Sequence, residues 1–339
     1  MRLFIIVLIS FSLISCGGSS SDDEVITRPI PLVSFAIADA PADSVTSVNV
    51  TFSSITLKSA SDDDDDDDDD QSGINIPILD DGGNPTTQTI DVMDYQNGEE
   101  LIIIENFELA AGDYSNLILN TSGCPQNPNG SDEFCWVIDN DTRKPLKTPS
   151  NKLKLGSFSV SGDEQQIYTI EFNLRSSLTS TAGGSAFNLK PHGIRIVDST
   201  EVGTLQGSVD VNLLSAGEDC ESNFLENTDH GKVVYLYQGE MVEGVVFVDE
   251  FDPDEAENAR PESAVKPYGS DTLSFDVDTN SYVYSFSHLP IGNYTVAFSC
   301  SAVGDSADEY DDIVIATPEL QIHAVTIVKG IDLIQNFTE

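Results

Sequence analysis

Cysteine is the residue type in this sequence whose positions point most directly to defined chemistry. The chain has 339 residues and five cysteines. Cys16 directly follows a short apolar segment, where its thiol is placed to receive a lipid. The other four, Cys124, Cys135, Cys220 and Cys300, are an even number, as two disulfides require. The sequence therefore predicts one modified thiol and two cross-links.

The segment before Cys16 has the order of a secretory signal. The cationic Arg2 precedes an apolar run over residues 3–14 that only Ser10 and Ser12 interrupt. This run is too short to span a bilayer. We therefore expect residues 1–15 to be a signal peptide and the polar residues 16–30 to be a flexible tether.

The end of this segment, Leu13-Ile14-Ser15-Cys16, resembles the bacterial lipobox. The resemblance implies cleavage before Cys16 and a diacylglyceryl group on its thiol, which anchors the protein to a membrane. Gly17 follows the cysteine, and similarity to proteobacterial lipoproteins then implies the outer membrane of a Gram-negative bacterium. The sequence leaves open whether the protein faces the periplasm or the medium. The alternative is a cleaved signal with an incidental cysteine.

The remaining cysteines are expected to form two disulfides, because exported proteins enter an oxidising compartment. Cys124 and Cys135 flank the turn-rich residues 125–130 and are paired on that basis, which leaves Cys220 to pair with Cys300. A metal site is not expected at the cysteines, because no Cys-x2-Cys pair occurs and the four histidines are far apart in the sequence.

The charge of the chain is strongly negative. With 58 acidic and 15 basic residues, the formal net charge is −43. Such a chain repels nucleic acid and anionic lipid headgroups, so we expect no nucleic-acid partner. Residues 62–70 are nine consecutive aspartates, predicted to lie in a solvated acidic loop over residues 61–72. Weak calcium binding by this run is an alternative, although a homopolymer lacks the varied ligands of a built calcium site.

The hydrophobic pattern predicts strands almost throughout and no amphipathic helix longer than two turns. In residues 45–57, for example, Val48, Val50 and Phe52 alternate with polar residues. Further strands are expected at residues 32–38, 74–79, 89–93, 101–104, 116–120, 205–214 and 296–300. The expected fold class is all-β, with two β-sandwich domains in tandem behind the lipidated tether.

Two similar turns support one sandwich in each half of the chain. Residues 109–115 and 289–295 each contain a glycine, a short polar residue and a tyrosine at the start of the following strand. Tyr114 and Tyr294 are each expected to bury the ring and donate the hydroxyl to loop backbone, as in the tyrosine corner of Greek-key sandwiches.

The first half resembles the bacterial lipoprotein family catalogued as domain of unknown function 4382. The resemblance rests on residues 35–41 with 48–52, 109–119, 146–150, 170–174 and 187–191, in that order, and covers about residues 32–197. It implies a β fold and an envelope location, and it supplies no catalytic residue. We therefore expect a domain over residues 31–199.

The second half, residues 202–339, resembles the carboxypeptidase regulatory-like domain, a small transthyretin-like sandwich. Residues 203–209, 233–237, 282–289 and the Gly292-Asn293-Tyr294 turn carry the resemblance. It implies a spacer or docking role on an exported protein. Residues 215–230 and 249–267 are insertions relative to the compact pattern.

Catalytic motifs are absent from the sequence. It contains no Gly-x-Ser-x-Gly, His-Glu-x-x-His or phosphate-binding Gly-x-x-x-x-Gly-Lys pattern, and no carboxylate pair stands out. His192 is expected to be a structural or surface histidine and not a catalyst, and Trp136 and Tyr237 are either core residues or sugar-stacking ones. We therefore expect no enzyme and no cofactor.

Three functional hypotheses follow. The preferred one is a non-catalytic cell-envelope lipoprotein that serves as a binding or spacer module for an unidentified protein or polysaccharide partner. The alternative is a calcium-responsive acidic surface or adhesion module that uses residues 62–70. The third is an unrecognised hydrolase.

Overall fold

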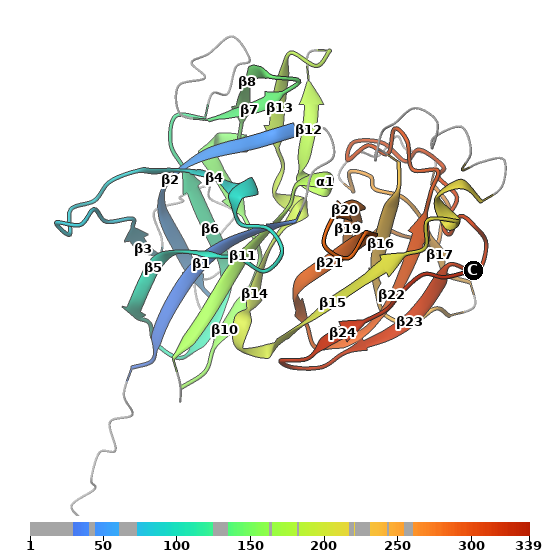
Figure 1. Cartoon of the computed structure of the whole chain (residues 1–339). Helices are drawn as coiled ribbons and strands as arrows, with labels where there is room; N and C mark the ends of the chain where they lie inside the picture. The colour runs from blue at the N-terminus through green and yellow to red at the C-terminus, as the bar shows by residue number, and fades with distance from the viewer. Residues whose placement is uncertain are drawn as a thin grey trace, which may run out of the picture.

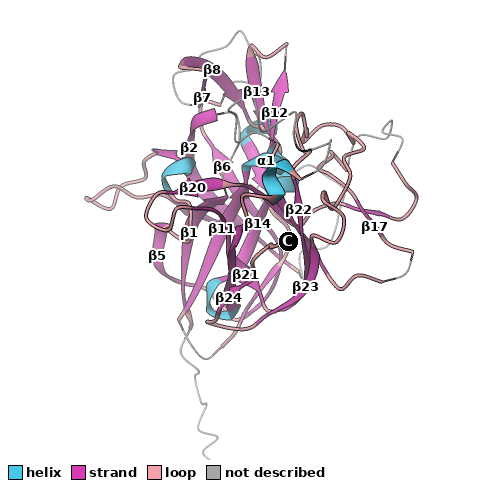
Figure 2. Cartoon of the chain, turned by 45° about the vertical axis from the view of Figure 1, so that its right-hand side comes forward, coloured by secondary structure: helices cyan, strands magenta, loops and turns pink. Residues whose placement is uncertain are grey.

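The computed structural model describes residues 30–40, 45–60, 73–124, 135–162, 165–181, 183–216, 220, 231–242, 244–253 and 260–339. Cys16, the predicted signal peptide and the aspartate run at residues 62–70 lie outside these ranges. The described residues form an all-β fold, as predicted, in two units that we call the N-terminal unit (residues 30–198) and the C-terminal unit (residues 202–339) (Figure 1). Helical segments in the described part of the chain are short (Figure 2).

The N-terminal unit consists of two sheets. The described residues give a four-stranded sheet in the order β14 (Ile194–Asp198), β11 (Gln166–Asn173), β1 (Leu32–Ala40), β5 (Leu101–Glu108). They also give a larger sheet in the order β10 (Phe158–Val160), β6 (Gly112–Thr121), β2 (Val45–Ser59), β7 (Trp136–Asp139), β8 (Thr142–Lys147), β13 (Ala186–Leu189), β12 (Leu178–Thr181). On this second sheet β3 (Ile74–Pro77) and β4 (Gln88–Asp91) pair with β2, and β9 (Lys152–Lys154) pairs with β6.

The core of the N-terminal unit lies between these sheets and is rich in aromatic rings. β1 occupies the middle of its sheet, parallel to β11 and antiparallel to β5. Phe35 of β1 stacks on Tyr168 of β11 with ring centres 6.0 Å apart, and Phe158 meets the same tyrosine at 4.9 Å. Because β1 is buried, its sequence is a nearly continuous apolar run rather than a strict alternation.

Halfway along the long strand β2, the apolar side chains that face the core switch from even-numbered to odd-numbered positions. Val48, Val50 and Phe52 are fully buried, as the alternation predicts, but farther along the buried apolar residues are Ile55 and Leu57. The pairing with β6 shifts register between Phe52 and Ser54. A bulge of this kind adds a residue and reverses which side chains face the core.

The C-terminal unit is a sandwich of two four-stranded sheets among the described residues. One has the order β20 (Ser274–Asp276), β21 (Ser281–Pro290), β15 (Val202–Val209), β24 (Asp332–Ile334). The other has the order β19 (Gly269–Thr272), β16 (Val233–Gln238), β22 (Gly292–Ser299), β23 (Ile322–Ile327). A short parallel pair joins β17 (Val246–Phe247) and β18 (Ala264–Val265).

The second of these sheets is covered on both faces. Val234 and Leu236 of β16 face the sandwich core, whereas Val233, Tyr235 and Tyr237 belong to a separate buried cluster with partly buried residues that include Phe247. This outer layer contains Phe247, Val265 of the inserted residues 249–267, and parts of residues 302–322. The insertion therefore contributes to the cover on the outer face of β16 together with the chain after Cys300.

The helical segments are single turns. They are α1 (Leu174–Ser177) and the 3-10 turns η1 (Val92–Asp94), η2 (Pro149–Asn151), η3 (Pro191–Gly193), η4 (Ser199–Glu201) and η5 (Leu213–Ser215). Two predicted strands run on into these turns, because β4 ends at Asp91 and β15 at Val209. In both places an aspartate ends the strand, since Asp91 accepts the Met93 N–H at 3.2 Å and Asp210 accepts the Asn212 N–H at 2.9 Å. The strand predicted at residues 74–79 was also too long, because β3 ends at Pro77, and the one predicted at residues 296–300 ends one residue early, at Ser299.

Both tyrosine corners are confirmed. The Tyr114 hydroxyl donates to the Ala110 carbonyl at 2.9 Å, and the Tyr294 hydroxyl donates to the Pro290 carbonyl at 3.0 Å. Both rings are buried, and each acceptor lies four residues before its tyrosine. The two units therefore use the same device to fix the start of β6 and of β22.

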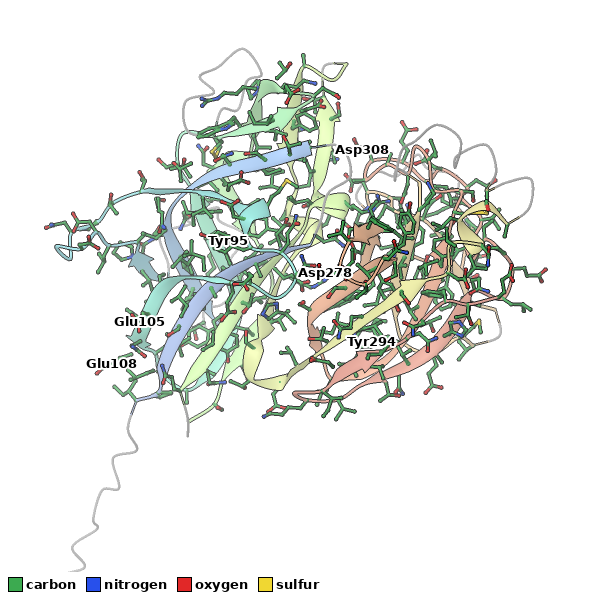
Figure 3. The ribbon with its side chains drawn as sticks, viewed as in Figure 1. Tyr95, Glu105, Glu108, Asp278, Tyr294 and Asp308 are labelled. Atoms are coloured by element: carbon green, nitrogen blue, oxygen red, sulfur yellow. A yellow bond between two sulfur atoms is a disulfide. The ribbon has the colours of Figure 1, made fainter. Side chains whose placement is uncertain are left out.

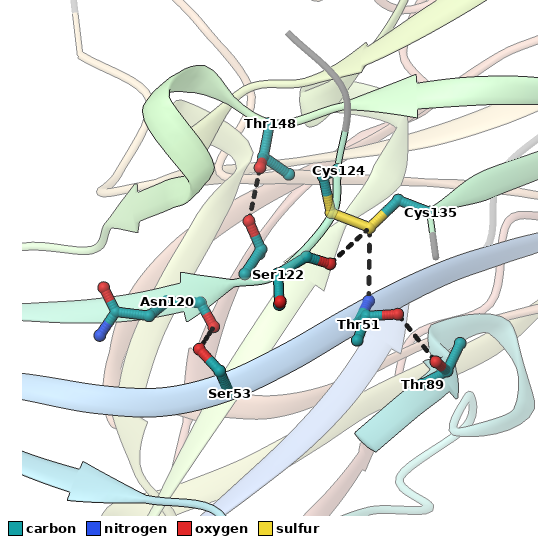
Figure 4. The surroundings of a disulfide bond; sticks show 9 residues. Thr51, Ser53, Thr89, Asn120, Ser122, Cys124, Cys135 and Thr148 are labelled. Carbon is teal, nitrogen blue, oxygen red and sulfur yellow. Dashed lines mark hydrogen bonds between the residues drawn. A yellow bond between two sulfur atoms is a disulfide. The ribbon is translucent and has the colours of Figure 1, made fainter. Parts of the chain in front are cut away.

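The two disulfides join the predicted partners. Cys124 and Cys135 are bonded 11 residues apart, and Cys220 and Cys300 are bonded 80 residues apart. All four are buried in a core, one pair in each unit. Figure 4 shows the first bond, where the Thr51 N–H of β2 points to the Cys135 sulfur at 3.5 Å. This disulfide therefore ties the chain between β6 and β7 to the central strand.

Replacing Tyr294 by Phe should lower the free energy of unfolding by about 1 kcal/mol, because the Pro290 carbonyl loses a buried donor while the ring stays in place. Tyr282→Phe is the matched control, since Tyr282 lies on the neighbouring β21, is partly exposed and contacts Phe275 only through its ring. Urea denaturation measures both. Equal effects of the two substitutions would argue against the corner.

Candidate functional site

Charged side chains gather where the two units meet, beginning at α1. The Asn173 side chain at the end of β11 accepts the Ser176 N–H at 3.3 Å, and the Ser177 hydroxyl donates to the Asn173 carbonyl at 2.7 Å. These bonds form one helical turn directly after the strand. The turn places Arg175 against the C-terminal unit, where its side chain is 4% exposed.

Arg175 binds three groups of the C-terminal unit. Its Nη2 lies 2.6 Å from Asp305 Oδ2, its Nε donates to Ser270 Oγ at 3.0 Å, and its Nη1 donates to Thr272 Oγ1 at 3.3 Å. The Tyr235 hydroxyl also donates to Asp305 Oδ2, at 2.7 Å. Burial opposes the charge on the guanidinium, but Asp305, Tyr235 and Glu250 together outweigh it and raise the pKa of Arg175. The guanidinium is therefore charged, buried and paired.

A second carboxylate completes this network. Glu250 is almost fully buried and accepts the Ser176 hydroxyl at 2.7 Å and the Ser270 hydroxyl at 2.8 Å. Lys266 Nζ lies 3.6 Å from it, and the Glu250 N–H donates to Asp305 Oδ1 at 3.2 Å. Residues of both units therefore bind the same carboxylate.

A second contact lies beside η3. Lys190 Nζ is 2.5 Å from Asp252 Oδ2 and 2.8 Å from Asp308 Oδ1, and His192 Nδ1 is 3.7 Å from Asp252 Oδ1 (Asp308 is labelled in Figure 3). Burial lowers the pKa of His192, with Lys266 adding to the effect, so the imidazole is neutral near pH 7. The expectation that His192 is structural agrees with this position.

A third contact lies along β14. The Arg195 guanidinium carbon is 3.8 Å from the centre of the Tyr268 ring, and its Nη1 donates to the Tyr268 carbonyl. Its Nε donates to Glu171 Oε2 at 2.9 Å. Nearby, His288 Nε2 lies 3.5 Å from Glu100 Oε2, and the hydrogen bond from His288 lowers the pKa of Glu100.

The contact between the units is complementary in charge. Arg195 pairs with Glu171 of its own unit and contacts the C-terminal unit only through the ring and carbonyl of Tyr268. The N-terminal unit contributes the cations Arg175 and Lys190, and the C-terminal unit contributes Glu250 and three aspartates, Asp252, Asp305 and Asp308. These groups bind one another, so the arrangement orients the two units. A cleft of about 480 Å³ beside α1 borders the contact, and Arg175, Asp305 and Asp308 form part of its wall.

Asp249 supports the loop that carries Asp305. Its Oδ2 accepts the Ile313 N–H at 2.7 Å and the Asp311 N–H at 3.2 Å. Its Oδ1 has no hydrogen-bond partner among the described residues. Burial, together with the nearby Asp305 and Asp311 carboxylates, raises the pKa of Asp249 to about 7 against the two backbone N–H groups that lower it.

The remaining predicted site residues fall in three places. Cys16 and residues 62–70 lie outside the described chain, so lipidation and calcium binding stay predictions. Tyr237 is buried and donates to the Val248 carbonyl at 2.8 Å, whereas Trp136 is half-buried beneath the Arg143 guanidinium at 3.9 Å. Neither ring is an open stacking surface. No group of three His, Cys, Asp or Glu residues that could hold a metal ion occurs in the described part of the chain.

Arg175, Lys190 and Arg195 belong to no motif in the sequence. The sequence holds no local signal for them, because basic residues are denser at residues 143–154, where five occur in twelve positions, than at residues 175–195.

The comparisons with known proteins identify one domain. Residues 32–191 match the family model for a domain of unknown function, DUF4382, which confirms the resemblance seen in the first half. No curated protein matches the chain. No helix in the described ranges has both the length and the apolar character needed to cross a membrane.

Several solved structures are similar at low identity. The Bacillus anthracis TIE protein is 12% identical with a TM-score of 0.19, and the match covers 91% of this chain and 34% of that one, so the chain spans about a third of its length. A candidate cell adhesion protein from Bacteroides eggerthii is 10% identical with a TM-score of 0.19 over 91% and 99% of the two chains. The minor pilin of Streptococcus agalactiae is 11% identical with a TM-score of 0.18 over 90% and 94%.

Arg175→Met should destabilise the protein by about 3 to 5 kcal/mol, because it leaves Asp305 buried without its cation. The double variant Arg175→Met/Asp305→Asn should recover part of this loss. Lys329→Met is the control, since it breaks the exposed pair with Glu201, whose atoms lie 2.6 Å apart, and should cost less than about 1 kcal/mol. Equilibrium denaturation measures all three, and equal losses in the two single variants would contradict the assignment.

Asp249→Asn should stabilise the protein more at about pH 8 than at about pH 5. The folded-state pKa near 7 is above the usual 3.8, so the native state holds a proton that the unfolded chain releases, and stability falls as pH rises from about 4 to about 7. The asparagine keeps an acceptor oxygen and abolishes this titration. Melting temperatures measured across pH check it, with the exposed Asp278→Asn as control. A difference from wild type that does not vary with pH would refute the prediction.

Proposed function

We propose that this chain is a non-catalytic lipoprotein of the cell envelope, a binding or spacer module for a protein or polysaccharide partner. Cys16 carries the lipid, residues 16–30 form the tether, and the outer membrane of a Gram-negative bacterium is the destination. The two units then stand off the membrane together.

One observation carries the proposal. The cations and carboxylates buried between the units bind one another, so they serve orientation. His192 is held against Asp252, and Asp305 is held by Arg175 and Tyr235. Acid–base catalysis uses side chains of these types, but here they hold the two sandwiches in one arrangement. A fixed arrangement of this kind is what a spacer or a binding module requires.

The C-terminal unit also supports a role as a spacer or binding module. Its two facing four-stranded sheets are consistent with a carboxypeptidase regulatory-like, transthyretin-like module. The described part of the insertion over residues 249–267 contributes to the layer on the outer face of β16 and supplies Glu250 and Asp252 to the contact with the N-terminal unit. The insertion therefore gives this sandwich the carboxylates with which it contacts the N-terminal unit.

The anchor and the absence of catalysis are tested with wild-type protein and Cys16→Ala expressed in a Gram-negative host. The wild type should stay with the outer membrane in about 1 M salt, where screening is within about 3 Å, and its Cys16 peptide should carry acyl mass. Cys16→Ala should be either periplasmic or held by an uncleaved leader. Ser19→Ala in the tether is the control and should fractionate like the wild type.

Two outcomes would overturn the proposal. One is release of the wild type by salt alone with no acyl mass on Cys16. The other is turnover of peptidoglycan or envelope polysaccharide by the purified protein. In-cell cross-linking of the anchored protein then identifies the partner.

A further inference from the structure

The outer face of the β20–β21–β15–β24 sheet is lined with uncharged polar side chains. Along β15, Leu205 and Val209 face the core, so Gln206 and Ser208 face outward. Along β21 the buried residues are Tyr284 and Phe286, and Ser285 between them faces outward. The alternation thus presents amide and hydroxyl groups on one surface of a strongly acidic protein.

This surface is hollowed into one groove. A cavity of about 700 Å³ and another of about 480 Å³ share Asn97, Gln206 and Ser285 in their walls. A third, of about 310 Å³, adjoins the largest at Ser208 and Asn336. Such volumes suit small-molecule or oligomer binding.

The N-terminal unit forms one wall of the groove. Residues 96–98, between η1 and β5, approach β21, and a Cβ added to Gly98 would lie 3.2 Å from Ser287 Oγ. Gly98 also has a φ of +88°, which favours glycine. The wall that residues 96–98 supply therefore depends on the contact between the two units, whereas the cavity beside Phe275 is lined by the C-terminal unit alone.

The groove contains polar groups without intramolecular partners. The side chains of Asn97, Gln206 and Ser285 form no hydrogen bond with another described residue, and each can donate and accept. Asp271 in the wall is 4% exposed. Its Oδ2 accepts the Ser285 N–H at 2.8 Å, whereas its Oδ1 has no partner among the described residues. Burial raises the pKa of Asp271 to about 7.

An exposed aromatic ring stands at one end. Phe275 on β20 is 46% exposed, borders the cavity of about 310 Å³, and is held by an edge contact with Tyr282 at 5.2 Å. An exposed ring beside hydrogen-bonding groups offers an apolar face for stacking and polar groups for orientation.

From this juxtaposition we infer that the groove binds an uncharged oligosaccharide or polysaccharide. The inference rests on the proposed function and names the partner class. A chain of charge −43 disfavours an anionic polymer, and the one cation in the walls, Lys329, is paired with Glu201. Of the wall carboxylates Asp210, Asp271, Asp276 and Asp332, all but Asp332 already accept backbone N–H groups. The side chains of Asn97, Gln206 and Ser285 can donate hydrogen bonds to the hydroxyls of a neutral sugar and accept hydrogen bonds from them.

The test is binding of the full-length lipidated protein, in detergent, to an immobilised panel of neutral oligosaccharides with alginate oligomers as acidic members. At least one neutral sugar should bind, with an affinity that does not change between low and high salt. Gln206→Ala should weaken it about fivefold, as expected for one lost hydrogen bond. Phe275→Ala should weaken it about five- to tenfold.

Gln238→Ala, an exposed strand glutamine on the other sheet, is the matched control and should bind like the wild type. Circular dichroism and melting temperature establish that the variants fold. Failure of every neutral sugar to bind, preference for alginate, or wild-type affinity in both groove variants would overturn the inference.

Failure of this inference is distinguishable from failure of the proposed function. Protein that is acylated, anchored and inert toward polymers but binds no sugar would refute the groove alone. Protein that binds a neutral sugar and hydrolyses it would leave the groove standing and refute the non-catalytic function.

Discussion

The ion pair between Arg175 and Asp305 is the interaction on which the arrangement of the two units depends. Both side chains are nearly excluded from solvent, and moving two charges out of water costs several kcal/mol for each ion. The cost is offset in part by further hydrogen bonds, from the guanidinium to Ser270 and Thr272 and from Tyr235 to the Asp305 carboxylate. Any displacement of one unit relative to the other would leave one of these charges buried and unpaired.

This dependence extends into the C-terminal unit. Asp305 reaches Arg175 because the chain after Cys300 folds back over the outer face of β16. Asp249 holds that segment through the backbone at Asp311 and Ile313. A sandwich without the outer layer would expose Tyr235 and Tyr237 and would have no carboxylate at the contact. The ion pair between Arg175 and Asp305 therefore depends on the outer layer that covers β16.

Local features of this fold were predictable from the sequence, and the contact between the units was not. Alternation identified most strands, and a glycine followed by a tyrosine identified both corners, because each signal is contained in a few consecutive residues. The alternation rule missed the reversal in β2, since a bulge depends on the pairing partner. Arg175 and Asp305 are 130 residues apart, and only the tertiary fold brings them together.

An acidic protein with few cations faces a particular constraint when it joins two units. Both halves carry excess negative charge, so their approach is repulsive until specific cations are inserted between them. Buried pairs contribute more to the choice of one orientation than to net stability. Here that orientation brings residues 96–98 against β21, so a polar groove takes one wall from each unit. The wall that residues 96–98 supply is lost when the units separate, even if each sandwich remains folded. The charges at the contact therefore fix the position of residues 96–98, and that position forms one wall of the polar groove beside the contact.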